Sequence, residues 1–512
     1  MEKISPVKYN KMHCTRCGEF TTADLVAFNF SKLFALAIEN TNDETWQSLV
    51  RLDLKFYYTI RDICQEMHYV LNTKKLGKLN LTVRQVIKQL EFLMKPATFE
   101  EIKNNHRNSH LYNNLFETIS SNHSSFDEKM ADIEKLVQTL MSHQLNDVII
   151  SIPLQIILDK DDLGNEMPIG IRYVIGEKIY EDFNRVCPRC GEVFDGQAGY
   201  YREYIIGLAG LARVGKTAYI ASLIDRLKKF SDDNFISIAK ENYEKNDSFI
   251  KFNDEIVSKY HQGQIISKTA VENTDEIPLV YLSLKIKGED YNFVFVDMPG
   301  EVFDSDGDEG IDFISEKRHI LKSADAIWCC VEPAMFNNKY HNLKYSRANN
   351  TKIDQLANLA NTLNNLYPAK TPACIIVTQS DLLKNDYPNL YQPQTNVMQE
   401  YLIEGQILNL NQVNEFVSST RDFVKQMLSF EATIGDIFEG FSMFSIASYG
   451  YDVNDDKLTG QNIAPSMVEL PFIWTLASLG CLEAKKINVN KNIFGKEKET
   501  IEDIIDKKEL YI

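Results

Sequence analysis

The chain has 512 residues, enough for two or three domains, and its 44% hydrophobic and 25% charged residues are typical of an ordinary globular protein. The formal net charge of −17 argues against nonspecific binding to nucleic acid or to an anionic membrane as the main activity. No apolar run approaches the roughly 20 residues of a membrane helix, and the first residues lack the apolar core of a signal peptide. We therefore expect a cytoplasmic protein without a membrane span.

Two cysteine motifs of the same form lie far apart in the chain. They read C-T-R-C-G at residues 14–18 and C-P-R-C-G at residues 187–191. Each turn can direct two thiolates toward one ion, so the pair predicts a structural zinc site whose ligands are Cys14, Cys17, Cys187 and Cys190. Because about 170 residues separate the motifs, we interpret them as a zinc ribbon, residues 1–20 and 183–200, that carries an inserted domain. Two separate redox pairs, or motifs completed by another ligand such as His13, are the alternatives.

The stretch between the cysteine motifs, residues 21–182, divides into two parts. Up to about residue 143 the apolar residues recur at helical spacing, as they do in residues 46–70, and this pattern predicts packed helices. Residues 148–157 and 169–175 are rich in β-formers and predict two strands joined by a polar turn. We therefore expect a mainly helical insert with a short β region.

The pattern G-x-x-x-x-G-K-[ST] follows the second cysteine motif, between an apolar strand at residues 204–206 and a helical pattern at residues 218–227. A phosphate-binding loop requires this context of strand, loop and helix, and a chance glycine-rich turn is the alternative. The glycines allow successive N–H groups and the helix N-terminus to face a polyphosphate. The lysine then reaches the outer phosphates, and the threonine hydroxyl ligates Mg²⁺. The predicted nucleotide-binding residues are Gly210, Leu211, Ala212, Arg213, Val214, Gly215, Lys216, Thr217 and Ala218.

A second predicted strand, residues 291–296, ends in the sequence D-M-P-G-E. A carboxylate at the C-terminal end of a buried strand beside a phosphate loop holds Mg²⁺, usually through water, and Asp297 has this position. Gly300 can bring its N–H to a γ-phosphate, which makes the loop a nucleotide-sensing switch. An Asp-x-Pro-Gly turn that merely closes the strand is the alternative.

Three further apolar stretches, residues 326–331, 373–377 and 443–446, predict the remaining strands of the sheet. They indicate an α/β domain of the P-loop NTPase type, residues 201–480, with helices on both faces of the sheet. The charged residues 481–512 predict a terminal helix or tail.

In this order, the motifs make residues 200–480 resemble the P-loop GTPases of the translation-factor-related (TRAFAC) class. More narrowly, the region resembles the bacterial double-GTPase group, in which a zinc ribbon precedes the GTPase domain. The cues are C-P-R-C-G before the phosphate loop, D-M-P-G-E, V-E-P at residues 331–333 and E-L-P-F-I-W at residues 469–474. The resemblance implies binding and hydrolysis of GTP in a bacterial conflict or signalling system. It also implies a protein partner, a companion GTPase or an effector, reached through the helical insert or the switch loops.

The sequence T-Q-S-D at residues 378–381 resembles the guanine-specificity motif [NT]-K-x-D, with Thr378 as its first residue. In this resemblance Asp381 accepts hydrogen bonds from guanine N1–H and from the exocyclic amine, a pairing that adenine does not offer. Gln379 replaces the lysine of the family, so its stem can lie along the base but brings no positive charge. Ala447 aligns with the small loop whose backbone N–H reads guanine O6. Because the lysine is missing, an ATPase is an alternative.

The resemblance also indicates which residues sense and cleave the γ-phosphate. A threonine of the first switch closes on Mg²⁺, and Thr269 fits the double-GTPase pattern better than the alternative, Thr274. Glu301 has the place of the glutamine that orients the attacking water, but a carboxylate cannot donate a hydrogen bond as an amide does. We therefore expect slow hydrolysis, with a nonhydrolysing nucleotide-sensing scaffold as a further alternative. The expected catalytic residues are Lys216, Glu301 and Thr269, and the expected Mg²⁺ ligands are Thr217, Thr269 and Asp297.

Overall fold

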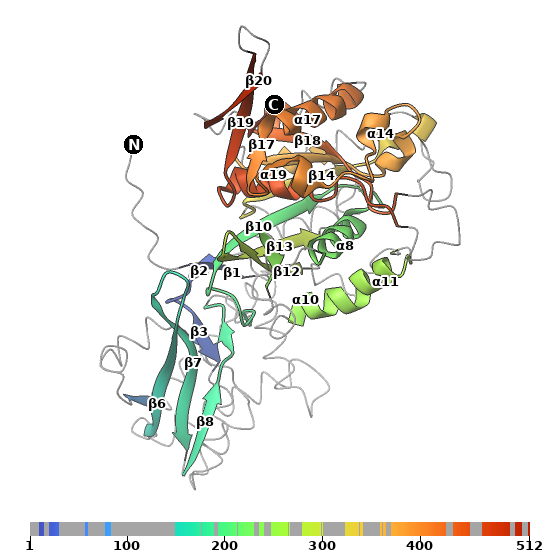
Figure 1. The fold of residues 1–512 in the computed structure, drawn as a ribbon. Helices are drawn as coiled ribbons and strands as arrows, with labels where there is room; N and C mark the ends of the chain where they lie inside the picture. The colour runs from blue at the N-terminus through green and yellow to red at the C-terminus, as the bar shows by residue number, and fades with distance from the viewer. Residues whose placement is uncertain are drawn as a thin grey trace, which may run out of the picture. The chain divides into compact units, whose positions relative to one another are not determined.

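The structure is a computed structural model, and it describes residues 10–14, 20–29, 57–59, 77–82, 149–175, 177–188, 193–211, 213–229, 235–239, 247–264, 266, 279–297, 300, 323–336, 338–340, 359–360, 362–364, 370–425, 434–450, 463–491, 497–503 and 510–511. The chain forms two compact units, Met1–Tyr201 and Arg202–Ile512 (Figure 1). Within the described residues, no helix combines the length and the apolar character needed to cross a membrane.

The C-terminal unit is built on a seven-stranded mixed sheet with the order β11-β12-β13-β10-β14-β15-β18. The strands from β13 to β18 in this order are mutually parallel, whereas β12 runs antiparallel to β11 and β13. Parallel strands end at one edge of a sheet, so the loops that follow them gather there. The strands span Arg202–Ala209 (β10), Ile236–Ile238 (β11), Leu279–Ile286 (β12), Glu289–Asp297 (β13), Ala326–Val331 (β14), Ala373–Val377 (β15) and Phe441–Ser445 (β18).

The apolar runs of the sequence form the centre of this sheet. Every residue of β14, β15 and β18 is buried, which means that protein covers both faces of these strands. Continuous apolar runs of this kind distinguish a strand covered on both faces from one that alternates between core and solvent. The mixed sheet and its helices therefore fit the α/β domain of P-loop type that the sequence predicts.

Helices connect the strands of the C-terminal unit. The helix α8 follows β10 directly, and the helical segment α10–η4–α11 lies between β11 and β12. The α-helices are Lys216–Leu227 (α8), Asp247–Phe252 (α10), Ser258–His261 (α11), Pro333–Phe336 (α14), Val397–Glu400 (α16), Leu410–Val424 (α17) and Leu470–Leu479 (α19). The π-helix Asn253–Val257 (η4) and the 3₁₀-helices Asn338–Tyr340 (η5), Ser380–Leu383 (η6) and Pro388–Leu390 (η7) complete them.

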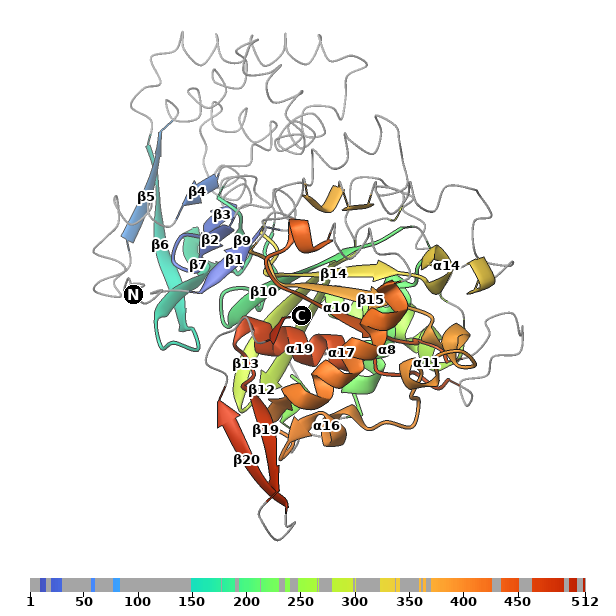
Figure 2. The ribbon, with the colours of Figure 1, turned by 90° about the horizontal axis from the view of Figure 1, so that it is seen from above.

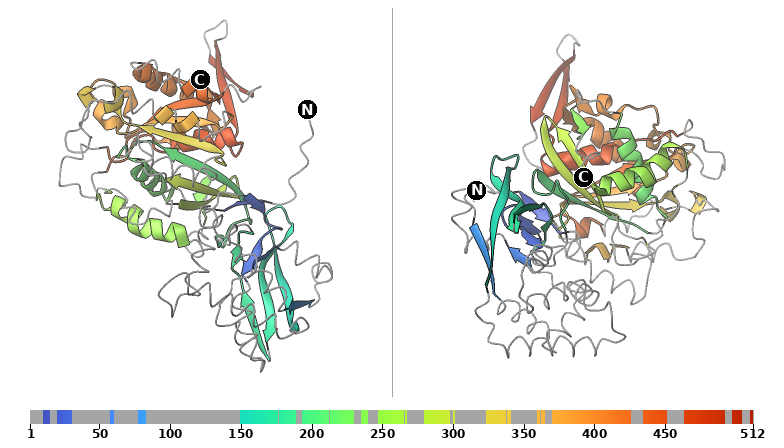
Figure 3. Two further views of the ribbon diagram at one scale, coloured as in Figure 1. Left: turned by 180° about the vertical axis from the view of Figure 1, so that it is seen from behind. Right: turned by 90° about the horizontal axis from the view of Figure 1, so that it is seen from below.

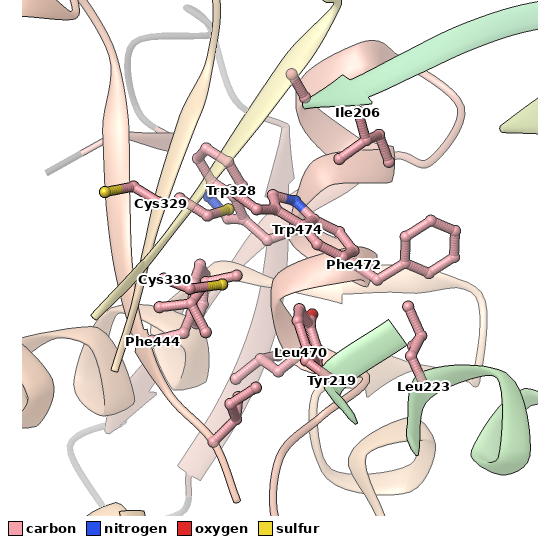
Figure 4. Packing of buried hydrophobic residues seen from close by; sticks show 14 of the residues in the cluster. Ile206, Tyr219, Leu223, Trp328, Cys329, Cys330, Phe444, Leu470, Phe472 and Trp474 are labelled. Carbon is pink, nitrogen blue, oxygen red and sulfur yellow. The ribbon is translucent and has the colours of Figure 1, made fainter. Parts of the chain in front are cut away.

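Trp328 of β14 stands at the centre of an apolar cluster that fixes α8 and α19 on the sheet (Figure 4). Its ring centroid lies 5.0 Å from that of Tyr219 on α8 and 6.2 Å from that of Phe472 on α19. Its indole N–H donates to the Thr475 hydroxyl at 2.9 Å, so the polar atom of the buried ring is also satisfied. Because both helices contact one side chain, they pack on the same face of the sheet, and α8 has a fixed place at the end of β10.

The C-terminal residues form strands where the sequence analysis expected a charged helix or tail. Strands β19 and β20 pair antiparallel, and β19 also pairs with β17 in a four-stranded sheet. The cause is the alternation of polar residues with Ile487 and Val489, a period of two that outweighs the high charge. The β19–β20 hairpin extends away from the rest of this unit (Figure 2, Figure 3). The strands span Leu402–Ile403 (β16), Ile407–Asn409 (β17), Ala484–Lys491 (β19) and Glu497–Asp503 (β20).

The N-terminal unit, where it is described, consists of strands. A hairpin (β1–β2), a three-stranded sheet (β4-β3-β9) and a four-stranded sheet (β5-β6-β7-β8) are present. Strands β6 and β7 occupy the two β-rich stretches that the sequence predicts, and the chain turns between them at Asp161, whose backbone and carboxylate both bond Asn165. The strands span Lys11–His13 (β1), Phe20–Thr22 (β2), Ala27–Asn29 (β3), Tyr57–Thr59 (β4), Gly77–Thr82 (β5), Ile149–Lys160 (β6), Glu166–Ile175 (β7), Lys178–Asp182 (β8) and Arg185–Val186 (β9).

The expectation of a mainly helical insert is corrected at two places. Tyr57–Thr59 lies in an expected helical stripe but forms β4, and Gly77–Thr82 forms β5. Both segments have a local β preference, because β4 consists of aromatic and β-branched residues and β5 alternates polar and apolar residues. The remaining residues of the expected helices, up to residue 143, lie outside the described residues.

Candidate functional site

Three loops meet at the edge of the seven-stranded sheet where the parallel strands end. They follow β10, β15 and β18, which are joined in register by β14 and by direct pairing. The Thr378 hydroxyl, after β15, donates to the backbone O of Val214 at 2.7 Å and lies 3.1 Å from the backbone O of Val331. The Ser380 N–H donates to the backbone O of Ile446, after β18, at 2.9 Å. These bonds bring the phosphate-loop motif, T-Q-S-D and the loop at residues 446–450 together.

The phosphate-loop motif has a curled backbone that its glycines allow. Gly210 has φ 148° and Gly215 φ 90°, and between them Arg213 is left-handed with φ 68°. A Cβ atom on Gly210 would lie 2.5 Å from the backbone O of Cys330, so no larger residue fits at this position without displacing β14. Left-handed residues within such a turn point successive N–H groups to one side, which creates a concave site for an anion. The site therefore has the backbone shape that a polyphosphate requires.

Lys216 lies in the first turn of α8 with its ammonium group inside the curl. The residue is 7% exposed, and Nζ donates to the backbone O of Gly210 at 2.7 Å and to that of Leu211 at 3.1 Å. The first turn of α8 contains no acidic residue that would compete for a bound anion. A buried ammonium group at the N-terminus of a helix favours a negatively charged ligand at this place.

Asp297 ends β13, and its position is set by the pairing of this strand with β10, where it lies opposite Leu208. Its carboxylate accepts a hydrogen bond from the Thr217 hydroxyl at 2.6 Å, and the residue is 6% exposed. Burial raises the pKa of Asp297 above its usual value, while the charge of Lys216 and the Thr217 hydrogen bond act in the opposite direction. The loop and the strand thus place two oxygen atoms that can bind a metal ion, one from Thr217 and one from Asp297, side by side near the lysine.

These donors fit a magnesium ion. Mg²⁺ prefers oxygen ligands and is usually held by one or two protein groups together with water and phosphate oxygens. No group of three His, Cys, Asp or Glu side chains that could hold a metal occurs within the described residues. A site completed by a nucleotide requires no such group, because phosphate oxygens supply the remaining ligands.

The base side of the candidate site is held by main-chain conformation. Gln379 is left-handed with φ 55° and precedes η6, in which Asp381 is 7% exposed. Ala447 forms a two-bond bridge with Ser466, because its N–H donates to the Ser466 O at 3.0 Å and its O accepts from the Ser466 N–H at 2.8 Å. The Ala447 amide is therefore engaged within the protein, which differs from the expectation that it faces a base. The next amide along the loop is that of Ser448.

Several predicted site residues lie outside the described residues. They are Ala212, Thr269, Thr274, Glu301, Cys17 and Cys190. Gly300 is described and buried, three residues after Asp297. The roles expected for the first switch and for Glu301 stay predictions.

The residues that flank the two cysteine motifs pair with the same spacing. His13 pairs with Phe20 around the first motif, and Val186 pairs with Val193 around the second, so six residues lie between the paired residues in each case. Strand β3, which follows the first pair, also pairs antiparallel with β9, which contains Val186. Cys14 is 1% exposed and Cys187 is 2% exposed. Sequence-distant halves of the expected ribbon therefore belong to one compact structure.

Sequence reasoning missed two residues that organise the site, Tyr260 and Tyr449, and one contact of the predicted residue Thr378. The contact of Thr378 with the phosphate loop follows from the sheet order, which the motif alone does not contain. The Tyr260 hydroxyl contacts the loop after β18 at Ser448, and Tyr449 of that loop contacts Ile266 through its hydroxyl, although neither tyrosine belongs to a recognisable motif. The only local signal is that aromatic residues stand next to Ser448 and within a polar helix.

The sheet, the curled loop and the Thr217–Asp297 pair together fit a P-loop nucleotide-binding domain. Residues 204–436 match the family model of Double-GTPase 2, and this match supports a GTPase of the double-GTPase type. The match covers a little under half of the chain, from β10 to the segment before β18, so the N-terminal unit lies outside it. No curated protein matches the chain.

Proposed function

We propose that this protein binds GTP with Mg²⁺, hydrolyses it slowly and acts as a nucleotide switch of the TRAFAC class. The observation that carries the proposal is the 2.6 Å hydrogen bond between Thr217 and Asp297, beside the buried Lys216. A helix N-terminus, an ammonium group and two oxygen donors at one sheet edge are the groups that a magnesium–triphosphate complex requires. The double-GTPase match supports the same class.

On the phosphate side, the curled backbone binds and orients the nucleotide. The N–H groups of residues 213–217 surround the β-phosphate, and Lys216 exchanges its bonds to Gly210 and Leu211 for bonds to phosphate oxygens. Thr217 and Asp297 would hold Mg²⁺, which neutralises charge on the outer phosphates when it is bound. Lys216 adds a fixed positive charge where negative charge develops during phosphoryl transfer.

On the base side, we propose that Asp381 binds guanine through N1–H and the exocyclic amine. Gln379 lies along the base without adding charge, and the Ser448 N–H takes the role first expected of Ala447 at guanine O6. This revision follows from the bridge that occupies the Ala447 amide. Thr378 stabilises this side by holding the T-Q-S-D segment on the phosphate loop.

For the switch, we propose that Thr269 and the segment from Asp297 to Glu301 respond to the γ-phosphate, with Gly300 as the sensing amide. Glu301 holds the attacking water by accepting its hydrogen bond. Because a carboxylate does not donate to the γ-phosphate, intrinsic hydrolysis is slow and an arginine from a partner would accelerate it. The resemblance to double-GTPases supports a cytoplasmic role in a bacterial conflict or signalling system with such a protein partner.

We also propose that Cys14, Cys17, Cys187 and Cys190 hold one structural zinc ion. The equal spacing of the pairs that flank the motifs and the β3–β9 pairing support a shared site, since both motifs belong to the same compact unit. Thiolate ligands from two such turns complete a tetrahedral site, and zinc then stabilises the fold of the unit. Metal analysis tests this: Cys190→Ser should lose the zinc, and an unchanged zinc content would reject the shared site.

The nucleotide proposal is tested by equilibrium titration of the purified chain with GTP and ATP, followed by single-turnover phosphate release. We expect Mg²⁺-dependent binding of GTP that is tighter than binding of ATP, and slow release that Thr217→Ala abolishes. Ser222→Ala is the matched control. It removes a hydroxyl from the same helix, and this hydroxyl donates to the backbone O of Tyr219 within the helix. Tighter binding of ATP would favour the ATPase alternative. Release equally slow in wild type and Thr217→Ala would favour a nonhydrolysing scaffold.

A further inference from the structure

Two tyrosine hydroxyl groups join the loop after β18 to the segment that leaves α11. Tyr260 is fully buried, and its hydroxyl donates to the backbone O of Ser448 at 2.5 Å. The Tyr449 hydroxyl accepts from the backbone N–H of Ile266 at 3.0 Å and donates to the backbone O of Gln264 at 3.4 Å. The two rings lie 5.2 Å apart between centroids. Three hydrogen bonds and one ring contact thus connect segments that are more than 180 residues apart in the chain.

The loop itself is fixed by contacts that do not involve this segment. The Tyr391 hydroxyl donates to the backbone O of Gly450 at 2.9 Å, and the Ala464 N–H donates to the backbone O of Tyr449 at 2.9 Å. Gly450 is left-handed with φ 73°, and a Cβ atom there would lie 2.0 Å from the Ala464 backbone O. The loop therefore has a defined conformation, and the two tyrosines join it to Gln264, Ile266 and the end of α11.

Each of the two connected segments adjoins residues that we propose to bind or sense the nucleotide. On one side, the backbone O of Ile446 accepts from the Ser380 N–H, which places the loop against the segment of Asp381. On the other side, Ile266 stands three residues before Thr269, the threonine proposed for the first switch. Hydrogen bonds from the two tyrosine side chains to backbone groups therefore link the loop beside the base to the residues that precede the switch.

We propose that Tyr260 and Tyr449 are positioning residues that couple the base pocket to α11 and to Gln264 and Ile266, which follow it. A guanine base seated against residues 446–450 holds this loop in place, and the two hydroxyl groups then hold Tyr260, Gln264 and Ile266. The inference rests on the proposed function. Neutral hydrogen bonds of this kind contribute modestly, so the coupling amounts to about a two- to tenfold change in affinity or in local opening.

The hydroxyl groups, rather than the rings, carry this coupling, and substitution by phenylalanine separates the two. Tyr449→Phe removes the bonds to Ile266 and Gln264 but keeps the ring contact with Tyr260. Tyr260→Phe removes the bond to Ser448. Tyr391→Phe is the matched control, because it removes a hydroxyl bond to the same loop, at the backbone O of Gly450, and leaves Tyr260 and Tyr449 unchanged.

Hydrogen exchange of the full-length chain, read on peptides that contain Ile266, tests the coupling. Each protein is measured alone, with saturating Mg²⁺·GDP and with saturating magnesium pyrophosphate as a probe without a base. In wild type and in Tyr391→Phe we expect GDP to slow exchange at Ile266 about two- to tenfold, and pyrophosphate to slow it less. In Tyr449→Phe the slowing by GDP should be lost, and in Tyr260→Phe it should be reduced.

The outcomes separate this inference from the function on which it rests. If GDP binds to the wild type but slows exchange at Ile266 equally in Tyr449→Phe, the coupling is wrong and the nucleotide function stands. Equal slowing by pyrophosphate and GDP in the wild type would also overturn it, because the base would then play no part. If the wild type binds no guanine nucleotide in a direct titration, the proposed function itself fails.

Discussion

On the phosphate side of the candidate site, one run of eight residues supplies the curled backbone, the ammonium group and the threonine hydroxyl. On the base side, the contributing loops follow two different strands, β15 and β18, and the bonds that hold them in place join residues such as Thr378 and Val214, 164 positions apart. The difference teaches that phosphate binding depends on local backbone geometry, which a short motif encodes. Base recognition depends on how distant loops are tied together. Substitutions on the two sides should therefore fail in different ways.

The largest effect is expected from a pair of glycine substitutions in the phosphate loop. Gly210→Ala places a Cβ atom 2.5 Å from the Cys330 backbone O in a left-handed conformation, so it should lower the free energy of unfolding by about 3–5 kcal/mol. Gly215→Ala meets open space and bears only the backbone strain, about 1–3 kcal/mol. Chemical denaturation of both variants measures the difference. Equal losses would contradict the close approach of the loop to β14.

A smaller but more specific effect is expected from Lys216→Ala. Loss of the buried ammonium group should weaken binding of GTP by about 100-fold, because charge-assisted bonds to phosphate are the strong ones. The matched control is Lys229→Ala, since this exposed lysine follows the same helix and pairs with Asp225 on its surface. Isothermal titration of both variants gives the comparison. Unchanged affinity for GTP in Lys216→Ala would contradict a phosphate site at this lysine.

On the base side, Thr378→Val should weaken binding of guanine nucleotides by about five- to tenfold and leave binding of pyrophosphate unchanged. The substitution keeps the shape but removes the hydroxyl that bonds Val214, so T-Q-S-D is no longer tied to the phosphate loop. Thr378→Ser retains the hydroxyl and should behave as wild type. If valine weakened GDP and pyrophosphate equally, the two sides would not be separable at this residue.

The smallest change in stability, and the one with a defined pH dependence, is expected for Asp297→Asn in the protein without nucleotide. The folded-state pKa of Asp297 lies above its unfolded value because of burial, so the stability that this group contributes is present at acid pH and is lost as the pH rises through the folded pKa. The asparagine variant has no such loss. Its Tm should equal or exceed that of wild type at pH 8, with the difference closing toward pH 4, whereas Mg²⁺-dependent binding of GTP is lost. A Tm deficit that grows with pH would contradict this sign.

These two sides also show how far sequence reasoning reaches. Residues 210–217 and the strand before Asp297 could be predicted because strand, loop and helix are adjacent in the chain. The engagement of the Ala447 amide could not, since its partner Ser466 is set by the fold of a distant segment. Likewise the link from Tyr449 to Ile266 spans 183 positions and has no motif.

The predictions for the C-terminal hairpin and for the N-terminal unit were wrong for a different reason. In β19 the alternation around Ile487 was a usable signal, but the density of charge was given more weight than the period of two. Tyr57–Thr59 fits a helical stripe and a strand equally well, because a short apolar segment satisfies both periods. The pairing of β3 with β9, which joins the segments next to the two cysteine motifs, has no signal in the sequence.

The most direct test is a crystal structure of the chain with Mg²⁺ and a nonhydrolysable GTP analogue. The account predicts that Lys216 Nζ leaves the Gly210 backbone O for a phosphate oxygen, that Mg²⁺ lies between Thr217 and the phosphates near Asp297, and that Asp381 holds guanine. A nucleotide bound away from Lys216, or a pocket at Asp381 that prefers adenine, would contradict it.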